Sequence, residues 1–210
     1  MLFENAPLAL GLLLALVGYV FGSVSSAIVI CRLLGLPDPR GEGSGNPGTT
    51  NVLRLGGKKA AAATLVGDML KGVLPVLLAR LVTSDPLLWA FAGAGAFLGH
   101  LYPLFFRFQG GKGVATGLGV LLAWSFPAGV LTVLTWLVAA AIGRYSSAAA
   151  LTAFLMAPIY VGALSANTAL TLTMAAISLL TYWRHRSNIR KLFAGEESKI
   201  GEKTPPASDA

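Results

Sequence analysis

Residues 39–51 form the first segment whose residue types could do chemistry, because closely spaced glycines alternate there with hydroxyl and amide side chains. Glycine adopts positive φ angles and lets a ligand approach the backbone, and consecutive N–H groups freed in this way form an anion-binding nest. Arg40 and Arg54 flank the segment, and a guanidinium group binds phosphate through paired hydrogen bonds. The pattern predicts a loop for a phosphoryl group. The candidate substrate-binding residues are Gly43, Gly45, Asn46, Gly48, Thr50, Asn51 and Arg54, and Ser44 is a candidate catalytic residue.

A second glycine-rich turn, residues 109–116, places Lys112 between glycines directly before an apolar stretch. If that stretch is a helix, its N-terminus offers free N–H groups and the positive end of a dipole to an anion. Gly110, Gly111 and Gly113 are therefore predicted to bind substrate together with Lys112. The first segment is not a Walker A loop, because no Gly-Lys-Ser/Thr follows at the required spacing. The structural alternatives are a flexible turn for the first segment and a tight loop with a cytoplasmic lysine anchor for the second.

His185 and Asn188 lie three residues apart in a basic segment, residues 184–197. On a helix, this spacing puts both side chains on one face. Docking onto anionic lipid would explain the basic residues of the segment, but it gives no reason for His185 or Asn188. Ser147 belongs to a short polar turn, residues 143–147, where a plain interfacial turn and a substrate-binding site are equally supported.

The composition identifies the elements that must position these segments. Only 12% of the 210 residues are charged and 55% are hydrophobic, whereas an ordinary soluble domain has about 25% charged residues. This excludes a soluble cytosolic enzyme and a disordered chain, and it leaves an integral membrane protein. The predicted fold class is an all-α polytopic membrane protein, a compact bundle of seven transmembrane helices. We expect the spans at residues 8–34, 60–82, 87–106, 114–142 (two helices divided at residues 124–127), 148–163 and 168–183.

Lys and Arg occur in alternate connections between these spans, and basic loops stay on the cytoplasmic side. The N-terminus is therefore predicted outside and the C-terminus in the cytoplasm. Residues 1–197 are expected to form a single domain, and residues 198–210 a flexible cytoplasmic tail. A five-span alternative also keeps the tail inside, but it exports Arg144 and needs a helix of about 36 residues, well beyond a typical span. The net charge of +7 is assigned to this cytoplasmic face, so no nucleic-acid partner is expected.

The other reactive residues do not form a predicted metal site. Cys31 is the single cysteine, and His100 and His185 are far apart in the sequence, so no metal site is expected. Asp68 and Lys71 are three residues apart within a predicted span, where a lone charge costs about 2.5–3.5 kcal/mol on insertion scales. Their spacing allows an ion pair, and an internal brace is at least as well supported as a catalytic role.

Three of these segments resemble the cytoplasmic motifs of the bacterial PlsY family of acyl-phosphate-dependent glycerol-3-phosphate acyltransferases. The segments are residues 43–51, residues 110–116 and residues 184–189. The resemblance covers the whole chain, including the order of the motifs and the spans between them. It departs from the usual first motif at Thr49, where alanine is common. It implies transfer of a fatty acyl group from acyl phosphate to the sn-1 hydroxyl of sn-glycerol 3-phosphate, which gives lysophosphatidic acid and phosphate at the first step of phospholipid synthesis.

The resemblance also implies a multi-pass protein of the bacterial inner membrane, surrounded by lipid, with its active site facing the cytoplasm. It implies no cofactor, and an upstream partner enzyme that produces acyl phosphate. In this chemistry, the candidate catalytic residues are Ser44, Lys112, His185 and Asn188. Ser44 with its loop and Lys112 would bind the acyl phosphate. Arg54, His185 and Asn188 would bind glycerol 3-phosphate, and either His185 or a substrate phosphate oxygen would take the proton. A transporter or channel for phosphate or an organic phosphate is the alternative, but such proteins usually contain inverted repeats, and no repeat is visible.

Overall fold

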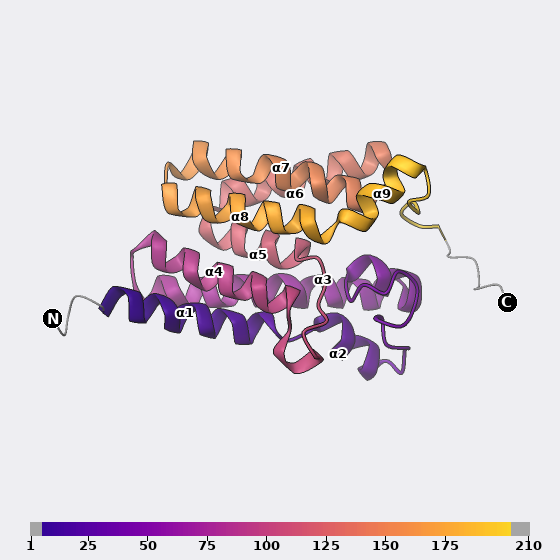
Figure 1. Ribbon diagram of the computed structural model, residues 1–210, viewed down its shortest axis with the longest axis horizontal. Coiled ribbons are helices and arrows are strands. Elements are labelled where there is room, and N and C mark those ends of the chain that lie inside the picture. The colour runs from indigo at the N-terminus through magenta and orange to yellow at the C-terminus, as the bar shows by residue number, and fades with distance from the viewer. Residues whose placement is uncertain (1–5, 203–210) are drawn as a thin grey trace.

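Helices make up the regular structure of residues 6–202, which is the part of the chain that the computed structural model describes. Figure 1 shows the long helices running side by side, with α9 and the C-terminal segment at the end opposite the start of α1. In chain order the helices are α1 (Ala6–Gly22), α2 (Ser26–Leu33), α3 (Thr49–Val82), α4 (Pro86–Leu101), η1 (Leu104–Phe106), α5 (Val114–Trp124), α6 (Phe126–Gly143), α7 (Ser146–Ser165), α8 (Thr168–Arg184) and α9 (Arg186–Ala194).

Helix α5 lies between two groups of helices and forms the centre of the core (Figure 1). It packs against α3 and α4 on one side and against α6 and α8 on the other. Val120 and Leu121 of α5 are fully buried, as are Phe97 of α4 and Phe154 of α7. Between helices in lipid, such contacts stabilise mainly through van der Waals packing. The loop that carries Lys112 therefore leads directly into the most enclosed helix of the bundle.

Small residues let α1 and α4 approach each other at backbone distance. A Cβ atom on Gly95 of α4 would overlap the carbonyl oxygen of Ala15 in α1, and a Cβ atom on Gly18 would overlap that of Ala92. Glycine and alanine at such positions are typical of helix pairs in membranes, because lipid gives no hydrophobic driving force for their association. The abundance of small residues in the apolar stretches thus serves packing.

The break predicted in the longest apolar stretch is confirmed. Helix α5 ends at Trp124 and α6 begins at Phe126, and Pro127 lies in the first turn of α6, where its missing N–H is tolerated. A second break was not predicted, since residues 23–25 separate α1 from α2 within the first apolar stretch. At this break, Lys71 Nζ donates to the carbonyl oxygen of Val24 at 2.9 Å, which satisfies an acceptor that has left the helical pattern.

Helix α3 also changes direction, at Gly57, whose backbone angles (φ 74°, ψ −171°) are not helical. Glycine adopts this conformation without the steric cost that a side chain would impose. The bend separates the first turns of α3, which contain Thr50 and Arg54, from the apolar part that matches the predicted span at residues 60–82. The same helix therefore contributes both to a polar segment and to the packed interior of the helix bundle.

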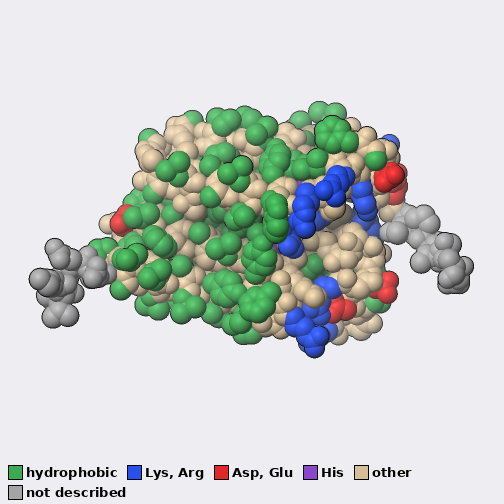
Figure 2. Space-filling model, in the orientation of Figure 1, with side chains coloured by type: hydrophobic (Ala, Val, Ile, Leu, Met, Phe, Trp, Pro, Cys, Tyr) green, Lys and Arg blue, Asp and Glu red, His purple; other side chains and the backbone are tan. Residues whose placement is uncertain are grey.

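The structure confirms an all-α membrane architecture. Four segments of the described chain are long and apolar enough to cross a membrane: Pro7–Leu33, Pro86–Phe106, Phe126–Gly143 and Ser146–Ser165. Helices α5 and α8 are shorter, with 11 and 17 residues, and the seven crossings and the orientation of the termini stay predictions. Figure 2 shows hydrophobic side chains over the half of the visible face where α1 begins, and Lys and Arg side chains toward the end where α9 lies.

Candidate active site

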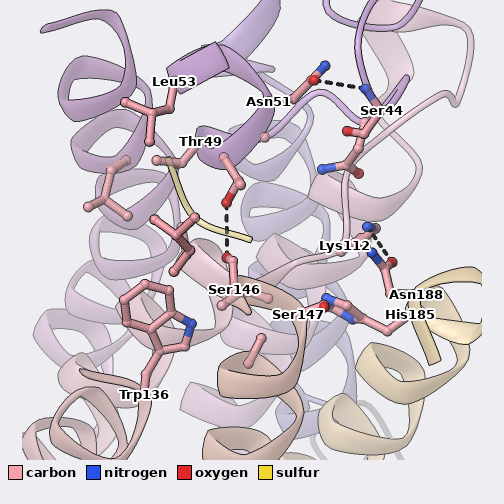
Figure 3. A pocket seen from close by; sticks show the side chains of 18 of the residues that line it. Ser44, Thr49, Asn51, Leu53, Lys112, Trp136, Ser146, Ser147, His185 and Asn188 are labelled. Atoms are coloured by element: carbon pink, nitrogen blue, oxygen red, sulfur yellow. Dashed lines mark hydrogen bonds between the residues drawn. The ribbon is translucent and has the colours of Figure 1, made fainter. Parts of the chain in front are cut away.

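A cavity of about 400 Å³ lies between α3, α5, α6 and α7, and the segment after α8 completes its wall. It brings together residues from all the polar segments that the sequence analysis singled out, although these are far apart in the chain (Figure 3). Of the predicted site residues, the cavity is lined by Ser44, Asn46, Gly48, Thr50, Asn51, Arg54, Lys112, Ser147, His185 and Asn188.

The cavity has a polar part and an apolar part, which different elements supply. The polar part consists of the residues named above, and in Figure 3 Lys112, His185 and Asn188 lie together on one side while Trp136 of α6 lies on the other. Apolar side chains of the membrane helices form the remaining wall: Leu53, Leu65, Met69, Val114, Leu118, Val133, Trp136 and Leu137. Sites of this kind bind ligands that combine a small charged group with an apolar body.

Asn51 organises the first glycine loop from within. Its side chain is 1% exposed, and Nδ2 donates to the carbonyl oxygens of Pro39 at 2.8 Å and Glu42 at 2.9 Å. Its Oδ1 accepts from the backbone N–H of Ser44 at 2.9 Å (Figure 3). Gly43 has φ +59°, and a Cβ atom there would collide with Asn51 Oδ1. The loop therefore has a fixed shape that presents Ser44 to the cavity.

Lys112, Asn188, Glu197 and Ser147 form a continuous chain of hydrogen bonds along the cavity wall. Lys112 Nζ donates to Asn188 Oδ1 at 2.6 Å (Figure 3), and Asn188 Nδ2 donates to Glu197 Oε1 at 2.7 Å. Ser147 Oγ donates to the same Glu197 oxygen at 2.5 Å. Lysine can only donate and a carboxylate can only accept, so the two partners fix the orientation of the Asn188 amide. The Glu197 carboxylate thus occupies the hydroxyl donor of Ser147 and one N–H donor of Asn188.

The surroundings of Lys112 lower the pKa of its ammonium group. Burial lowers the pKa of Lys112 to about 8, against the opposing effect of the Glu197 carboxylate, and Arg184 lowers it further. A buried ammonium group loses hydration, which favours the neutral form. A nearby anion would favour the charged form, because an opposite charge raises the pKa of an ammonium group.

His185 is 3% exposed and faces the cavity with one ring nitrogen free. Its Nδ1 lies 2.8 Å from the carbonyl oxygen of Thr181, and a carbonyl can only accept, so Nδ1 carries the proton and Nε2 has the lone pair. Burial lowers the pKa of His185 to about 4 and the bond to Thr181 opposes that shift. The imidazole is therefore neutral near pH 7 and can accept a proton or a hydrogen bond at Nε2.

The segment after α9 contacts Arg54 on the cavity wall and the backbone of Arg144. Arg54 Nη2 donates to Ser198 Oγ at 2.7 Å, and the backbone N–H of Ile200 donates to the carbonyl oxygen of Arg144 at 2.7 Å. Ser198 and Ile200 of the predicted tail line the cavity, and residues 203–210 lie outside the described residues. Arg40, the other arginine flanking the first loop, donates to Asp38 and to the Phe106 carbonyl oxygen instead.

Five of the predicted glycines do not line the cavity, and their substrate-binding role stays a prediction. They are Gly43, Gly45, Gly110, Gly111 and Gly113. In the second loop, packing against the end of α4 explains why a side chain is absent. A Cβ atom on Gly111 would collide with His100 Nε2, and one on Gly113, which has φ +86°, would collide with the ring of Phe97. These glycines let the loop lie on α4 and turn Lys112 toward the cavity.

Several residues that line the cavity were not among the predicted site residues. Thr49, Ser146 and Glu197 belong to this group, and Ser146 Oγ lies 3.0 Å from Thr50 Oγ1, which links the first turns of α7 and α3 (Figure 3). Thr49 and Ser146 directly precede the predicted residues Thr50 and Ser147, which also line the cavity, so the segments were predicted and these two residues were left out. Glu197 had no such signal, because an acidic residue is not expected where anions are bound.

Asp68 and Lys71 form a buried ion pair beside the inner part of the cavity. Lys71 Nζ lies 2.8 Å from Asp68 Oδ1, and His100 Nδ1 lies 3.8 Å from the same oxygen. Asp68 and His100 line the cavity. Because Lys71 also donates to Val24 at the break between α1 and α2, the pair joins three helices, as an internal brace would.

No group of three or more His, Cys, Asp or Glu side chains that could hold a metal ion occurs among residues 6–202.

Comparison with known proteins gives one consistent result. The family model described as glycerol-3-phosphate acyltransferase matches residues 12–195. The glycerol-3-phosphate acyltransferase of Halorhodospira halophila is 60% identical over 91% of this chain and 98% of its own length, and that of Methylococcus capsulatus is 52% identical over 88% and 93%. The crystal structure of PlsY, an integral membrane glycerol 3-phosphate acyltransferase, in its glycerol 3-phosphate form superposes with a TM-score of 0.87 at 38% identity, covering 91% of this chain and 96% of that one. The cavity and its polar wall therefore belong to a member of the glycerol-3-phosphate acyltransferase family of PlsY type.

Proposed function

We propose that this protein transfers a fatty acyl group from acyl phosphate to the sn-1 hydroxyl of sn-glycerol 3-phosphate, at the cytoplasmic face of a bacterial inner membrane. Acyl transfer to glycerol 3-phosphate is the activity of the family, and the donor, the position and the orientation are what we add. The supporting observation is the division of one cavity into a polar part near Lys112 and an apolar wall around Trp136. An acyl phosphate is divided in the same way, into a charged head and an apolar chain.

The reaction requires no covalent enzyme intermediate, because acyl phosphate is an activated anhydride. The sn-1 oxygen attacks the acyl carbonyl carbon and forms the ester bond, while the bond from that carbon to the phosphate oxygen breaks. Phosphate leaves, and the proton of the hydroxyl passes to His185 Nε2 or to a phosphate oxygen of a substrate. Each turnover gives one lysophosphatidic acid and one phosphate, and the protein contributes orientation and charge stabilisation.

We assign the phosphate of the donor to Lys112 and to the loop that Asn51 organises, where Ser44 provides a hydroxyl group. We assign glycerol 3-phosphate to Arg54, His185 and Asn188. Arg54 would then exchange its hydrogen bond with Ser198 for one with the substrate phosphate. The neutral His185, with Nε2 free, suits the removal of a proton from the sn-1 hydroxyl.

The cytoplasmic location rests on the positively charged loops, which stay inside. Arg54, Lys112 and Lys191 all line the cavity, so the side that holds these charges is also the side from which the phosphates enter. The donor must come from a separate reaction that joins a fatty acyl group to phosphate, and an acyl-phosphate-producing enzyme is therefore the upstream partner. The transporter alternative has no support among the relatives, which are acyltransferases.

Product formation by the purified protein tests the proposal. With acyl phosphate and glycerol 3-phosphate, we expect equimolar release of phosphate and lysophosphatidic acid, and with acyl-CoA in place of acyl phosphate we expect none. Lys112→Met, which removes the charge but keeps a side chain of similar length, is the negative control and should release little of either product. Robust turnover with acyl-CoA alone would overturn the choice of donor, and uptake of unmodified glycerol 3-phosphate into vesicles without product would favour a transporter.

A further inference from the structure

Arg184, the last residue of α8, contacts the second glycine loop rather than the cavity. Its Nε donates to the carbonyl oxygen of Gly111 at 3.1 Å, and its Nη2 donates to that of Gly110 at 2.7 Å. The guanidinium group lies over the ring of Tyr102, 5.8 Å from its centre. Arg184 is absent from the cavity wall, whereas the next residue, His185, belongs to it. The N–H groups that Arg184 uses in these two hydrogen bonds therefore hold the loop and are not free to bind a substrate.

The loop depends on these bonds because it has no regular structure of its own between η1 and α5. The N–H of Gly111 donates to the carbonyl oxygen of His100 at 3.2 Å, so α4 holds one side of the loop. Arg184 holds the other side by donating two hydrogen bonds to loop carbonyl oxygens, in the planar geometry that only a guanidinium group provides. Lys112, the next residue, is thereby turned toward Asn188.

We propose that Arg184 is a positioning residue for the acyl-transfer reaction, and that its forked contact with the Gly110 and Gly111 carbonyls sets the place of Lys112 relative to His185 and Asn188. The end of α8 then does two things at once: Arg184 fixes the loop that carries the cation, and His185 enters the cavity beside it. This inference rests on the proposed function, since the readout is turnover of the two substrates.

Substitution of Arg184 by lysine distinguishes the effect of the paired hydrogen bonds from the effect of the positive charge. Arg184→Lys keeps the positive charge but cannot bond both carbonyls in one plane, and Arg184→Gln removes the charge as well. The matched controls are Arg186→Lys and Arg186→Gln. Arg186 is exposed, lies 4.6 Å from the centre of the Trp183 ring and donates to the carbonyl oxygen of Trp183, so these variants change the same charges two residues away without touching the loop.

We expect Arg184→Lys and Arg184→Gln each to lower kcat/KM by about tenfold to a hundredfold, the scale on which small misplacements of catalytic groups act. The Arg186 variants should stay within about twofold of the unchanged protein, as for other exposed charges. The midpoint of thermal unfolding in detergent should not move in Arg184→Lys. In a protein that already carries Lys112→Arg, Arg184→Lys should lower kcat/KM by a much smaller factor than in the unchanged protein, because substitutions of interacting residues give non-additive losses.

Each other outcome overturns the inference. Near-normal turnover of Arg184→Lys would show that charge alone suffices. Loss of activity together with loss of thermal stability, or losses that simply multiply in the double variant with Lys112→Arg, would make Arg184 an ordinary structural residue. Failure of the unchanged protein to form product would contradict the proposed function itself, and it is distinguished from these results by the first measurement of the series.

Discussion

Lys112 Nζ and Asn188 Oδ1 lie 2.6 Å apart and join the glycine loop before α5 to helix α9. The two residues are 76 positions apart in the chain, and neither could be assigned a partner from its own segment. Because the same amide donates through Nδ2 to Glu197, the cation and the carboxylate are held at opposite ends of one side chain. If a phosphate binds Lys112 as proposed, we expect the hydrogen bonds of Asn188 and Glu197 to change with it.

The titration of Lys112 predicts an alkaline limit to activity. Its pKa is lowered to about 8, mainly by burial, so the side chain is charged below that pH and becomes neutral as the pH rises through it. We expect kcat/KM to fall above about pH 8, by roughly tenfold per pH unit for a single essential group. Lys112→Arg should remove this limb because guanidinium stays charged.

Steady-state rates between about pH 6 and about pH 10 provide the check on this limb, with the uncatalysed hydrolysis of acyl phosphate subtracted at each pH. A flat profile for the unchanged protein, or the same limb in Lys112→Arg, would contradict the assignment of Lys112.

Two substitutions of His185 test whether it removes the hydroxyl proton. Asparagine keeps a donor for the Thr181 carbonyl oxygen but has no lone pair in the place of Nε2, whereas alanine removes both. Since loss of a general base costs on the order of 10²–10⁴ in rate, we expect His185→Asn and His185→Ala to lower kcat alike, with KM for glycerol 3-phosphate little changed. The pKa near 4 also predicts constant activity from about pH 7 down to about pH 5, because neutral His185 persists over that range.

The kinetic pattern separates the alternatives for this residue. A rise of KM without a fall of kcat would make His185 a substrate ligand rather than a base. Near-normal turnover of His185→Asn would leave the proton to a phosphate oxygen of a substrate.

Local signals in the sequence predicted much of the fold and of the site. Pro127, two residues after Ser125, marked the break between α5 and α6. The spacing of His185 and Asn188 predicted one shared face of a continuous helix. Both side chains line the cavity, but His185 lies at the junction between α8 and α9, and Asn188 lies in α9. Each of these features depends on residues that are close together in the sequence, so it can be recognised from the sequence alone.

Tertiary contacts decided what the sequence could not supply. The break at residues 23–25 contains no proline, and its Val24 carbonyl oxygen accepts a hydrogen bond from Lys71, 47 positions away. The contact of Arg184 with Gly110 spans 74 positions. Glu197, an acid among groups suited to anions, has its partner Ser147 50 positions away. Pairings at this separation leave no mark in local spacing.

Labelling of single cysteines tests the predicted orientation. Asp85 and Asn167 cap α4 and α8, in connections without Lys or Arg, and should react with a membrane-impermeant reagent from outside. Ser147 lies with Lys112 and His185 at the cavity and should react only after the membrane is opened. Cys31, at 1% exposure, should contribute no background. Reaction of a cysteine at position 147 from outside would favour the five-span arrangement instead.

The pair Asp68–Lys71 allows a test of brace against catalyst. Lys71→Met leaves a buried carboxylate without its cation, a loss that typically costs about 3–5 kcal/mol, whereas apolar replacement of both partners is often close to neutral. We therefore expect a large drop in the unfolding midpoint for Lys71→Met. Most of that drop should be recovered in the double variant Asp68→Leu with Lys71→Met, which still lacks the hydrogen bond to Val24. If the pair is a brace, acyl-transfer activity should return together with stability. If instead the double variant is stable but inactive while substrate binding persists, Asp68, which lines the cavity, takes part in the reaction.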